Sequence, residues 1–208
     1  METIRDKLAQ VFRAAELLNE NLWLDCIDSS AMSVDEFAEH VERTYGVKVD
    51  FFSLDVEVEH VYGFIERYGE GGRQARIFIA KNIGVRWMRL VGTKELCQVV
   101  LDKLADFRTD GEDTLQRLVT PIADLDAEEN VAVRSEQAAV YLAWELLYPH
   151  ELRKVDLKKL EANEVQLSEL AVQYGIPLSV VEIVLSKPYM EFADKWWEYT
   201  LAQRQAAE

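Results

Sequence analysis

The sequence is poor in the residues that build covalent and metal frameworks. It has two cysteines, Cys26 and Cys97, which stand far apart and belong to no C-x-x-C pair. Such thiols do not indicate a disulfide framework, so we expect buried free thiols in a reducing compartment. The three histidines, His40, His60 and His150, fall in no metal-binding spacing. We expect each of them at the surface or in a loop.

Long apolar runs are also absent. The sequence has no stretch of about 18 apolar residues, the length that a membrane-spanning helix needs. No apolar signal core follows the charged N-terminal residues 1–7. We therefore expect a cytoplasmic protein without a membrane partner.

Positive charge is scarce. There are 23 lysines and arginines against 38 aspartates and glutamates, a formal net charge of −15. An acidic chain repels nucleic acid phosphates and gains no free energy from counterion release. We expect no direct nucleic acid binding, and the same field favours encounter with basic protein surfaces. The acidic segment 106–130 predicts a solvated connection.

The remaining composition is that of a globular protein. Hydrophobic residues make up 49% of the chain, enough for one medium domain with a helical appendage. The capping box Ser33–Glu36 opens a helix that Gly46 ends, and the hydrophobic period then changes from 3.6 to 2. Grouped strands with helices beside them indicate an α+β fold. Helices are predicted near 3–27, 34–45, 85–105, 133–147 and across 150–208, and strands near 47–51, 60–68 and 75–80, with a hairpin turn at 70–72.

One predicted helix carries the spacing of a zinc site without its ligands. A zinc peptidase needs two neutral imidazoles at i and i+4, one helical turn apart, so that both reach one metal ion. Between them stands a glutamate that activates the zinc-bound water. Residues 94–98 read K-E-L-C-Q, so Glu95 fills the glutamate position and neither outer position holds a histidine.

A second segment makes that frame informative. Residues 135–149 read S-E-Q-A-A-V-Y-L-A-W-E-L-L-Y-P, which resembles the E-x-x-A-N-x-F-A-A-x-L-L-M-P signature of ImmA/IrrE-type peptidases. Residues 89–98 align without gaps on that family's R-F-T-L-A-H-E-L-G-H. Three shorter segments resemble its first strand, its I-x-I-N strand and its helical tail: 46–49, 77–82 and 171–179. The resemblance covers roughly residues 30–186.

The resemblance implies a zincin-like fold, with a small three-stranded sheet packed on the active-site helix and additional C-terminal helices. It divides the chain into a peptidase-type domain, 1–150, and a helical extension, 151–208. Active members bind zinc and cleave, or otherwise disable, a helix-turn-helix repressor, often in prophages, mobile elements or stress regulons. Carried over, their zinc ligands fall on Lys94, Gln98 and Glu136, and their general base falls on Glu95.

This sequence departs from the family at those positions. Lys94 is a cation at neutral pH and Gln98 offers only an amide oxygen, a weak zinc ligand, so we expect no zinc. Cys97 lies about 60° around the helix from Gln98 and does not replace a ligand. A buried carboxylate needs a cation, so we expect the Lys94 ammonium within about 4 Å of a Glu136 or Glu95 oxygen. Gln98 would then complete the set as a hydrogen-bond partner.

Three functions remain open. The first is a catalytically inactive pseudo-peptidase of a phage or mobile element that regulates by binding a protein, such as a basic DNA-binding repressor. The second is an active metallopeptidase with an altered metal site that cleaves a repressor. The third is an acidic decoy that mimics nucleic acid.

Two C-terminal features have a structural and a functional interpretation. Trp196 and Trp197 are candidate partner contacts, but core packing is the favoured interpretation, with one ring expected in the core and the other exposed. The segment 167–185 resembles a helix-turn-helix. A DNA reader carries Arg, Lys, Asn or Gln along its second helix, whereas this one offers Ser179, Glu182, Ser186 and Lys187, so we do not expect it to bind DNA.

Overall fold

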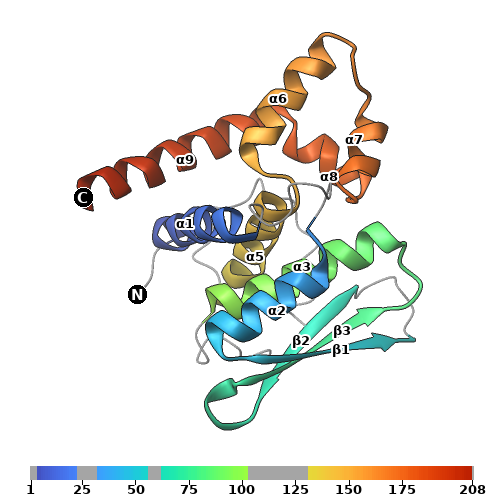
Figure 1. The fold of residues 1–208 in the computed structure, drawn as a ribbon, viewed down its shortest axis with the longest axis vertical. Helices are drawn as coiled ribbons and strands as arrows, with labels where there is room; N and C mark the ends of the chain where they lie inside the picture. Colours follow the sequence, from blue (N-terminus) through green and yellow to red (C-terminus); the bar gives the residue numbers. More distant parts are fainter. Residues whose placement is uncertain (1–3, 23–31, 56–61, 103–130, 208) are drawn as a thin grey trace. The chain divides into compact units, whose positions relative to one another are not determined.

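The computed structural model describes residues 4–22, 32–55, 62–102 and 131–207 (Figure 1). These residues form eight α-helices and a three-stranded mixed sheet, which confirms the α+β class. Cys26, His60 and the acidic segment 106–130 lie outside the described residues.

The chain forms two compact units. One consists of residues 34–140, and the other combines residues 1–33 with residues 141–208. The N-terminal helix thus falls in the same unit as the C-terminal helices, and the division into domains at residue 150 stays a prediction. Each unit is described below by itself.

The unit of residues 34–140 is built on the sheet. Its strands are β1 (Lys48–Leu54), β2 (Gly63–Tyr68) and β3 (Gln74–Ala80), in the order β1-β3-β2. β2 and β3 are antiparallel and are joined through the turn Glu70–Gly72, where Gly71 has a φ of 66°. This confirms the predicted hairpin, since a positive φ favours glycine. β1 pairs with β3 in parallel, an arrangement that the alternating pattern did not indicate.

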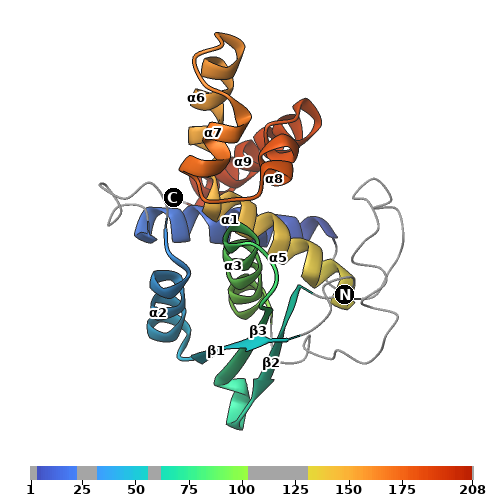
Figure 2. The ribbon, with the colours of Figure 1, turned by 90° about the vertical axis from the view of Figure 1, so that its right-hand side faces the viewer.

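Two helices cover one face of this sheet. Helices α2 (Val34–Tyr45) and α3 (Val85–Leu101) lie on the same side of it in both ribbon views (Figures 1 and 2). α3 approaches β2 closely because Gly63 has no side chain. A Cβ atom at Gly63 would overlap the Val91 side chain and lie 2.7 Å from the Phe78 carbonyl oxygen. The sheet therefore fixes the rotation of the helix that carries Lys94 and its neighbours.

The other unit is entirely helical among its described residues. It contains α1 (Ile4–Leu22), the C-terminal part of α5 (Val131–Leu147), α6 (His150–Glu161), α7 (Leu167–Gln173), α8 (Leu178–Val184) and α9 (Lys187–Ala207). Phe12 of α1 is fully buried and stacks on Trp196, with ring centroids 6.3 Å apart. Trp197 meets the same ring edge-on at 5.6 Å. Both tryptophans are half-buried, so each ring contributes to the packing of α1 against α9.

Two of the three histidines are placed differently from the expectation. His40 and His150 are buried, with 9% and 2% of their surface exposed. Hydrogen bonding makes this burial possible, because a buried imidazole needs partners. His40 Nε2 lies 3.3 Å from Thr44 Oγ1, and His150 Nε2 lies 2.8 Å from Asp194 Oδ1. Cys97 is a buried free thiol, as expected.

Candidate functional site: a lysine between two carboxylates

Two helices of the sheet-containing unit supply the four residues of the candidate site. Lys94, Glu95 and Gln98 stand on α3, and Glu136 stands near the start of α5. Lys94 and Gln98 are one helical turn apart and share a face of α3. The exposed fraction is zero for Glu95 and 4% for Gln98, and the Lys94 and Glu136 side chains are 16% and 18% exposed.

The side chains at 94 and 98 converge on the carboxylate of Glu136. Lys94 Nζ donates a hydrogen bond to Glu136 Oε2 at 2.6 Å. Gln98 Nε2 donates to the other oxygen, Oε1. Lys94 Nζ also lies 2.7 Å from Oε1 of Glu95. The predicted ion pair, and the predicted part of Gln98 in it, are therefore both confirmed.

A further hydrogen bond joins the chain at the end of α3 to α5, one helical turn beyond Gln98. Asp102 follows the last turn of α3, and its Oδ2 accepts a hydrogen bond from Ser135 Oγ. Both side chains are buried. Positions 94, 98 and 102 thus face the 135–136 pair of α5. The sequence analysis missed Asp102 and Ser135, although the repeat of polar residues at four-residue steps was a usable signal.

The electrostatics of the site favour a permanent cation. Burial alone lowers the pKa of Lys94, but the Glu95 and Glu136 carboxylates outweigh that effect, so the pKa of Lys94 is raised. Burial raises the pKa of Glu95 to about 7, against the opposing pull of the Lys94 ammonium. Neither oxygen of Glu95 accepts a well-aligned hydrogen bond within the described residues, so its contact with Lys94 is ionic. A single ammonium serves two carboxylates.

The residues present do not fit a zinc ion. A protonated lysine has no lone pair to donate, and the amide nitrogen of Gln98 points its hydrogen at Glu136. Burial raises the pKa of Cys97 well above its ordinary value, so the thiol stays protonated. Within the described ranges, no group of three His, Cys, Asp or Glu side chains is placed to hold a metal ion. The four residues can instead hold a proton and fix the two helices together.

The other candidate residues belong to the helical unit. Trp196 and Trp197 pack on Phe12, and Trp197 Nε1 donates to Glu145 Oε2 at 3.1 Å. Their role as partner contacts remains a prediction. The segment 167–185 contains α7 and α8, whose axes differ in direction by 108°.

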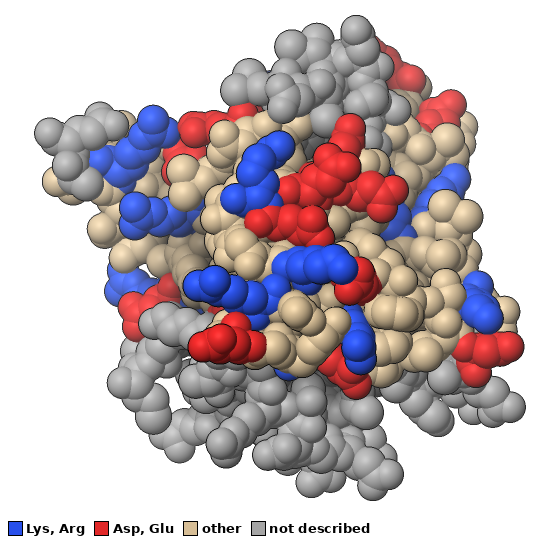
Figure 3. All heavy atoms as spheres, turned by 60° about the horizontal axis from the view of Figure 1, so that its bottom comes forward, with Lys and Arg blue, Asp and Glu red and all other residues tan. Residues whose placement is uncertain are grey.

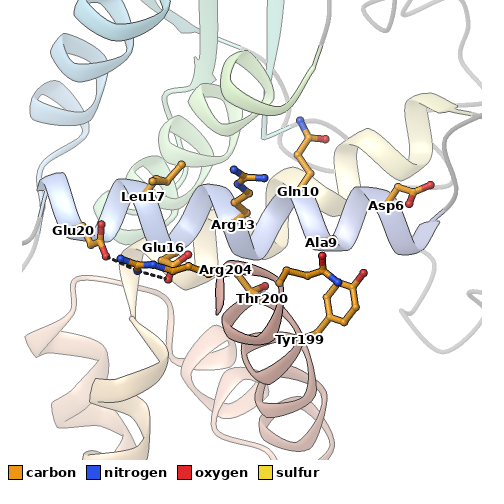
Figure 4. Close-up of a pocket in the computed structure, with 11 residues that line it drawn as sticks. Asp6, Ala9, Gln10, Arg13, Glu16, Leu17, Glu20, Tyr199, Thr200 and Arg204 are labelled. Atoms are coloured by element: carbon orange, nitrogen blue, oxygen red, sulfur yellow. Dashed lines mark hydrogen bonds and ion pairs between the residues drawn. The ribbon is translucent and has the colours of Figure 1, made fainter. Parts of the chain in front are cut away.

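The helical unit also holds a groove that sequence analysis did not indicate. It has a volume of about 680 Å³ and lies between α1 and α9 (Figure 4). Arg204 pairs in it with Glu16 at 3.1 Å and with Glu20 at 3.5 Å. Its lining mixes polar and apolar surface, and the polar residues include Asp6, Gln10, Arg13, Thr200 and Gln203. The residues that line the groove come from two helices at opposite ends of the chain, so no local sequence pattern indicated it.

Comparisons with protein-family models, with curated proteins and with solved structures find no match for this chain. In the part of the chain that the structure describes, no single helix is long and apolar enough to cross a membrane. One bent pair, Leu167–Gln173 with Leu178–Val184, reaches the necessary length and composition only when the two helices are taken together.

Proposed function

We propose that this chain is a catalytically inactive relative of the ImmA/IrrE-type peptidases and that it regulates by binding a protein. The observation that carries the proposal is the position of the Lys94 ammonium. It lies between Glu95 and Glu136, 2.7 Å and 2.6 Å from their oxygens, where the resemblance implies a zinc ion. The lysine supplies the positive charge that the carboxylates need, and it offers no metal coordination.

The zincin-like fold is part of the same proposal. In such a fold a small sheet packs beside the helix that carries the H-E-x-x-H positions. Here α3 carries Lys94 and Gln98, and it packs on β2 and β3. Glu136 reaches the same point from α5, where the resemblance implies the third ligand. This agreement of three positions supports the proposal independently of the sequence motifs.

The chemistry of the partner follows from the charge of the chain. A net charge of −15 attracts basic proteins and repels phosphates. A cytoplasmic DNA-binding repressor of a phage or mobile element fits that requirement, because its DNA-reading surface is basic. The acidic-decoy alternative receives less support. On the face shown in Figure 3, basic and acidic side chains are intermixed, whereas a nucleic acid mimic needs a regular row of carboxylates.

One observation favours an enzymatic alternative. Glu95 is a fully buried carboxylate with a pKa near 7, which is the range that a general acid or base requires. Among the described neighbours of Glu95 on α3, Thr93 is buried and the Cys97 thiol is protonated, so neither is a ready nucleophile. The enzymatic alternative predicts a hydrolytic activity that is retained when Lys94 is replaced by methionine and is lost when Glu95 is replaced by glutamine.

Restoring the missing imidazoles tests the main proposal. The variant Lys94→His with Gln98→His should bind close to one zinc ion per chain, because two imidazoles and Glu136 then converge on one point. The wild type should contain less than about 0.1 zinc per chain. Elemental analysis and a chelator-sensitive competition titration measure both quantities.

The matched control adds Glu136→Gln to the double variant and should bind zinc more weakly by about tenfold or more. A double variant that folds, as judged by circular dichroism, and yet gains no zinc contradicts the proposal that these positions descend from a zinc site. Near-stoichiometric zinc in the wild type contradicts the proposal that the chain is catalytically inactive. Capture of a protein from the source cell by the wild type then identifies the partner.

A further inference from the structure

Helices α7 and α8 form a helix-turn-helix arrangement. Their axes differ by 108°, and residues 174–177 connect them. Gly175 has a φ of 59° in this turn, and its N–H donates to the carbonyl of Val172 at 3.2 Å. These are the angle and the turn of the helix-turn-helix motif, in which the second helix is exposed for recognition. Here the exposed second helix is α8.

The exposed surface of this pair is partly apolar. The exposed fraction is 65% for Val172, at the end of α7, and 40% and 41% for Leu178 and Ile183 on α8. Successive helical residues turn by about 100°, so Leu178 and Ile183 stand at the two edges of an arc of about 140°. Glu182 and Ser179 lie between them on that arc, and both are exposed. The face therefore has a polar, acidic centre with aliphatic flanks.

The chain segment that forms this face is poor in positive charge. No lysine or arginine occurs between Lys159 and Lys187. The same segment contains four exposed glutamates: Glu161, Glu164, Glu169 and Glu182. A segment of this charge disfavours DNA phosphates, and α8 itself carries one glutamate and none of the basic or amide side chains that read base edges. The shape is that of a DNA-binding motif, but the charge suits a basic protein.

We propose that the exposed face of α7 and α8 is a docking surface for a basic amphipathic helix of a protein partner. This inference rests on the proposed protein-binding function and names the surface and the partner chemistry for it. Lysines or arginines on the partner would face Glu182 and its neighbours, and its aliphatic residues would cover Leu178, Ile183 and Val172. Removing these side chains from water supplies the driving force, and the glutamates supply the selectivity.

The test uses two synthetic helical peptides and the full chain. Each peptide has about 14 residues with leucines at i, i+3, i+4 and i+7, and its remaining positions are lysine in one and glutamate in the other. Fluorescence anisotropy should show binding of the lysine peptide and none of the glutamate peptide. Glu182→Lys, and separately Leu178→Ser with Ile183→Ser, should each weaken the binding by about tenfold.

The matched control is Glu198→Lys, which makes the same charge change at an exposed position of α9. It should change the affinity by less than about twofold. If Glu198→Lys weakens binding as much as Glu182→Lys, the peptide responds only to the overall charge and the proposal is overturned. Sub-micromolar binding of duplex DNA that Glu182→Lys alters would also overturn it. Urea melts establish that each variant is folded.

These outcomes are separate from the zinc experiment. The zinc test concerns α3 and α5 and leaves α7 and α8 unchanged. A chain that gains zinc as a histidine variant but ignores the lysine peptide keeps the proposed function and loses this surface. A chain that binds the peptide through Glu182 but gains no zinc keeps the surface and loses the peptidase ancestry.

Discussion

Each compact unit buries an acid–base cluster, and the two clusters satisfy their charges differently. In the helical unit, one cation, Arg153, serves one carboxylate, Glu145, and both side chains are fully buried. Arg153 Nη2 and Tyr189 Oη donate to one oxygen of Glu145, and Trp197 Nε1 donates to the other. Both carboxylate oxygens thus accept hydrogen bonds, whereas Nε and Nη1 of Arg153 have no hydrogen-bond partner among the described residues.

The cluster of the sheet-containing unit has fewer cations than carboxylates. There one ammonium, Lys94, serves both Glu95 and Glu136, so full ionisation leaves a net negative charge. Burial raises the pKa of Glu95 to about 7, whereas the Arg153 cluster holds its charges in balance. A strongly perturbed pKa beside a specific charge partner is the property by which candidate functional sites are recognised. The contrast is therefore one between a charge-balanced pair and a cluster with one carboxylate in excess.

The largest effect is expected from breaking the balanced pair. Glu145→Ala leaves the buried Arg153 without its counter-ion and should lower the free energy of unfolding by about 3–5 kcal/mol. Urea denaturation followed by circular dichroism measures the change. Arg153→Met with Glu145→Gln removes both charges and should cost clearly less. A loss of under about 1 kcal/mol for Glu145→Ala would show that this pair does not support the fold.

The unbalanced cluster should tolerate its own disruption better. Lys94→Met keeps the volume and removes the cation, and we expect a loss of about 2 kcal/mol in the free energy of unfolding. Part of the cost is avoided because Glu95 can take up a proton. Glu136→Gln in the same background should recover some stability by removing one of the two carboxylates. A Lys94→Met variant as stable as the wild type contradicts the stabilising role of the ammonium.

The titration of Glu95 sharpens the comparison further. Its pKa is about 7 in the folded chain, against 4.5 as the ordinary value. Between these values the unfolded chain releases the proton and the folded chain retains it. The stability contributed by Glu95 is therefore complete below about pH 4.5 and is lost as the pH rises through about 7.

The measurable quantity is the difference between the wild type and Glu95→Gln. The wild type should lose stability relative to the variant between pH 4.5 and 7, with a slope of up to about 1.4 kcal/mol per pH unit. Urea melts at a series of pH values provide it, and Glu145→Gln serves as the comparison in the balanced cluster. Parallel pH profiles for wild type and Glu95→Gln would contradict the raised pKa.

The smallest change in the free energy of unfolding is expected from an exposed ion pair. Lys187 Nζ lies 3.7 Å from Glu191 Oε1, and both side chains are largely exposed. Lys187→Gln should change the free energy of unfolding by less than about 0.5 kcal/mol, because solvent screens the pair. The same denaturation assay applies. A change as large as that of Lys94→Met would mean that burial does not account for the difference between the pairs.

Much of the fold could be predicted from local patterns. The change of period at Gly46, the glycines of the 70–72 turn and the helical spacing after Gly84 correspond to β1, the hairpin and α3. These signals are local, because strand alternation, turn conformation and helical faces each depend on a few neighbouring residues. The parallel pairing of β1 with β3 had no such signal, since the partners are about 26 residues apart: Lys48 faces Gln74.

The buried polar contacts, like the fold, include some that could be predicted from the sequence and some that could not. The residue types at 94, 95, 98 and 136 predicted a lysine–glutamate contact, because a buried carboxylate requires a positive partner. The contacts of Asp102 with Ser135 and of Glu145 with Arg153 and Trp197 could not be predicted, because they depend on how helices far apart in the sequence pack. His150 was expected at the surface for the same reason: its burial depends on Asp194, 44 residues away.

The sequence by itself determined where the helices and strands of the described segments form, the acidic character of the chain and the absence of imidazoles at 94 and 98. These properties follow from residue types and their local spacing. Only the tertiary structure decided that one ammonium lies between two carboxylates and that α7 and α8 meet at the angle of a helix-turn-helix with Glu182 exposed on α8. Proximity and burial determine pKa values and binding surfaces, and both arise when distant segments pack together.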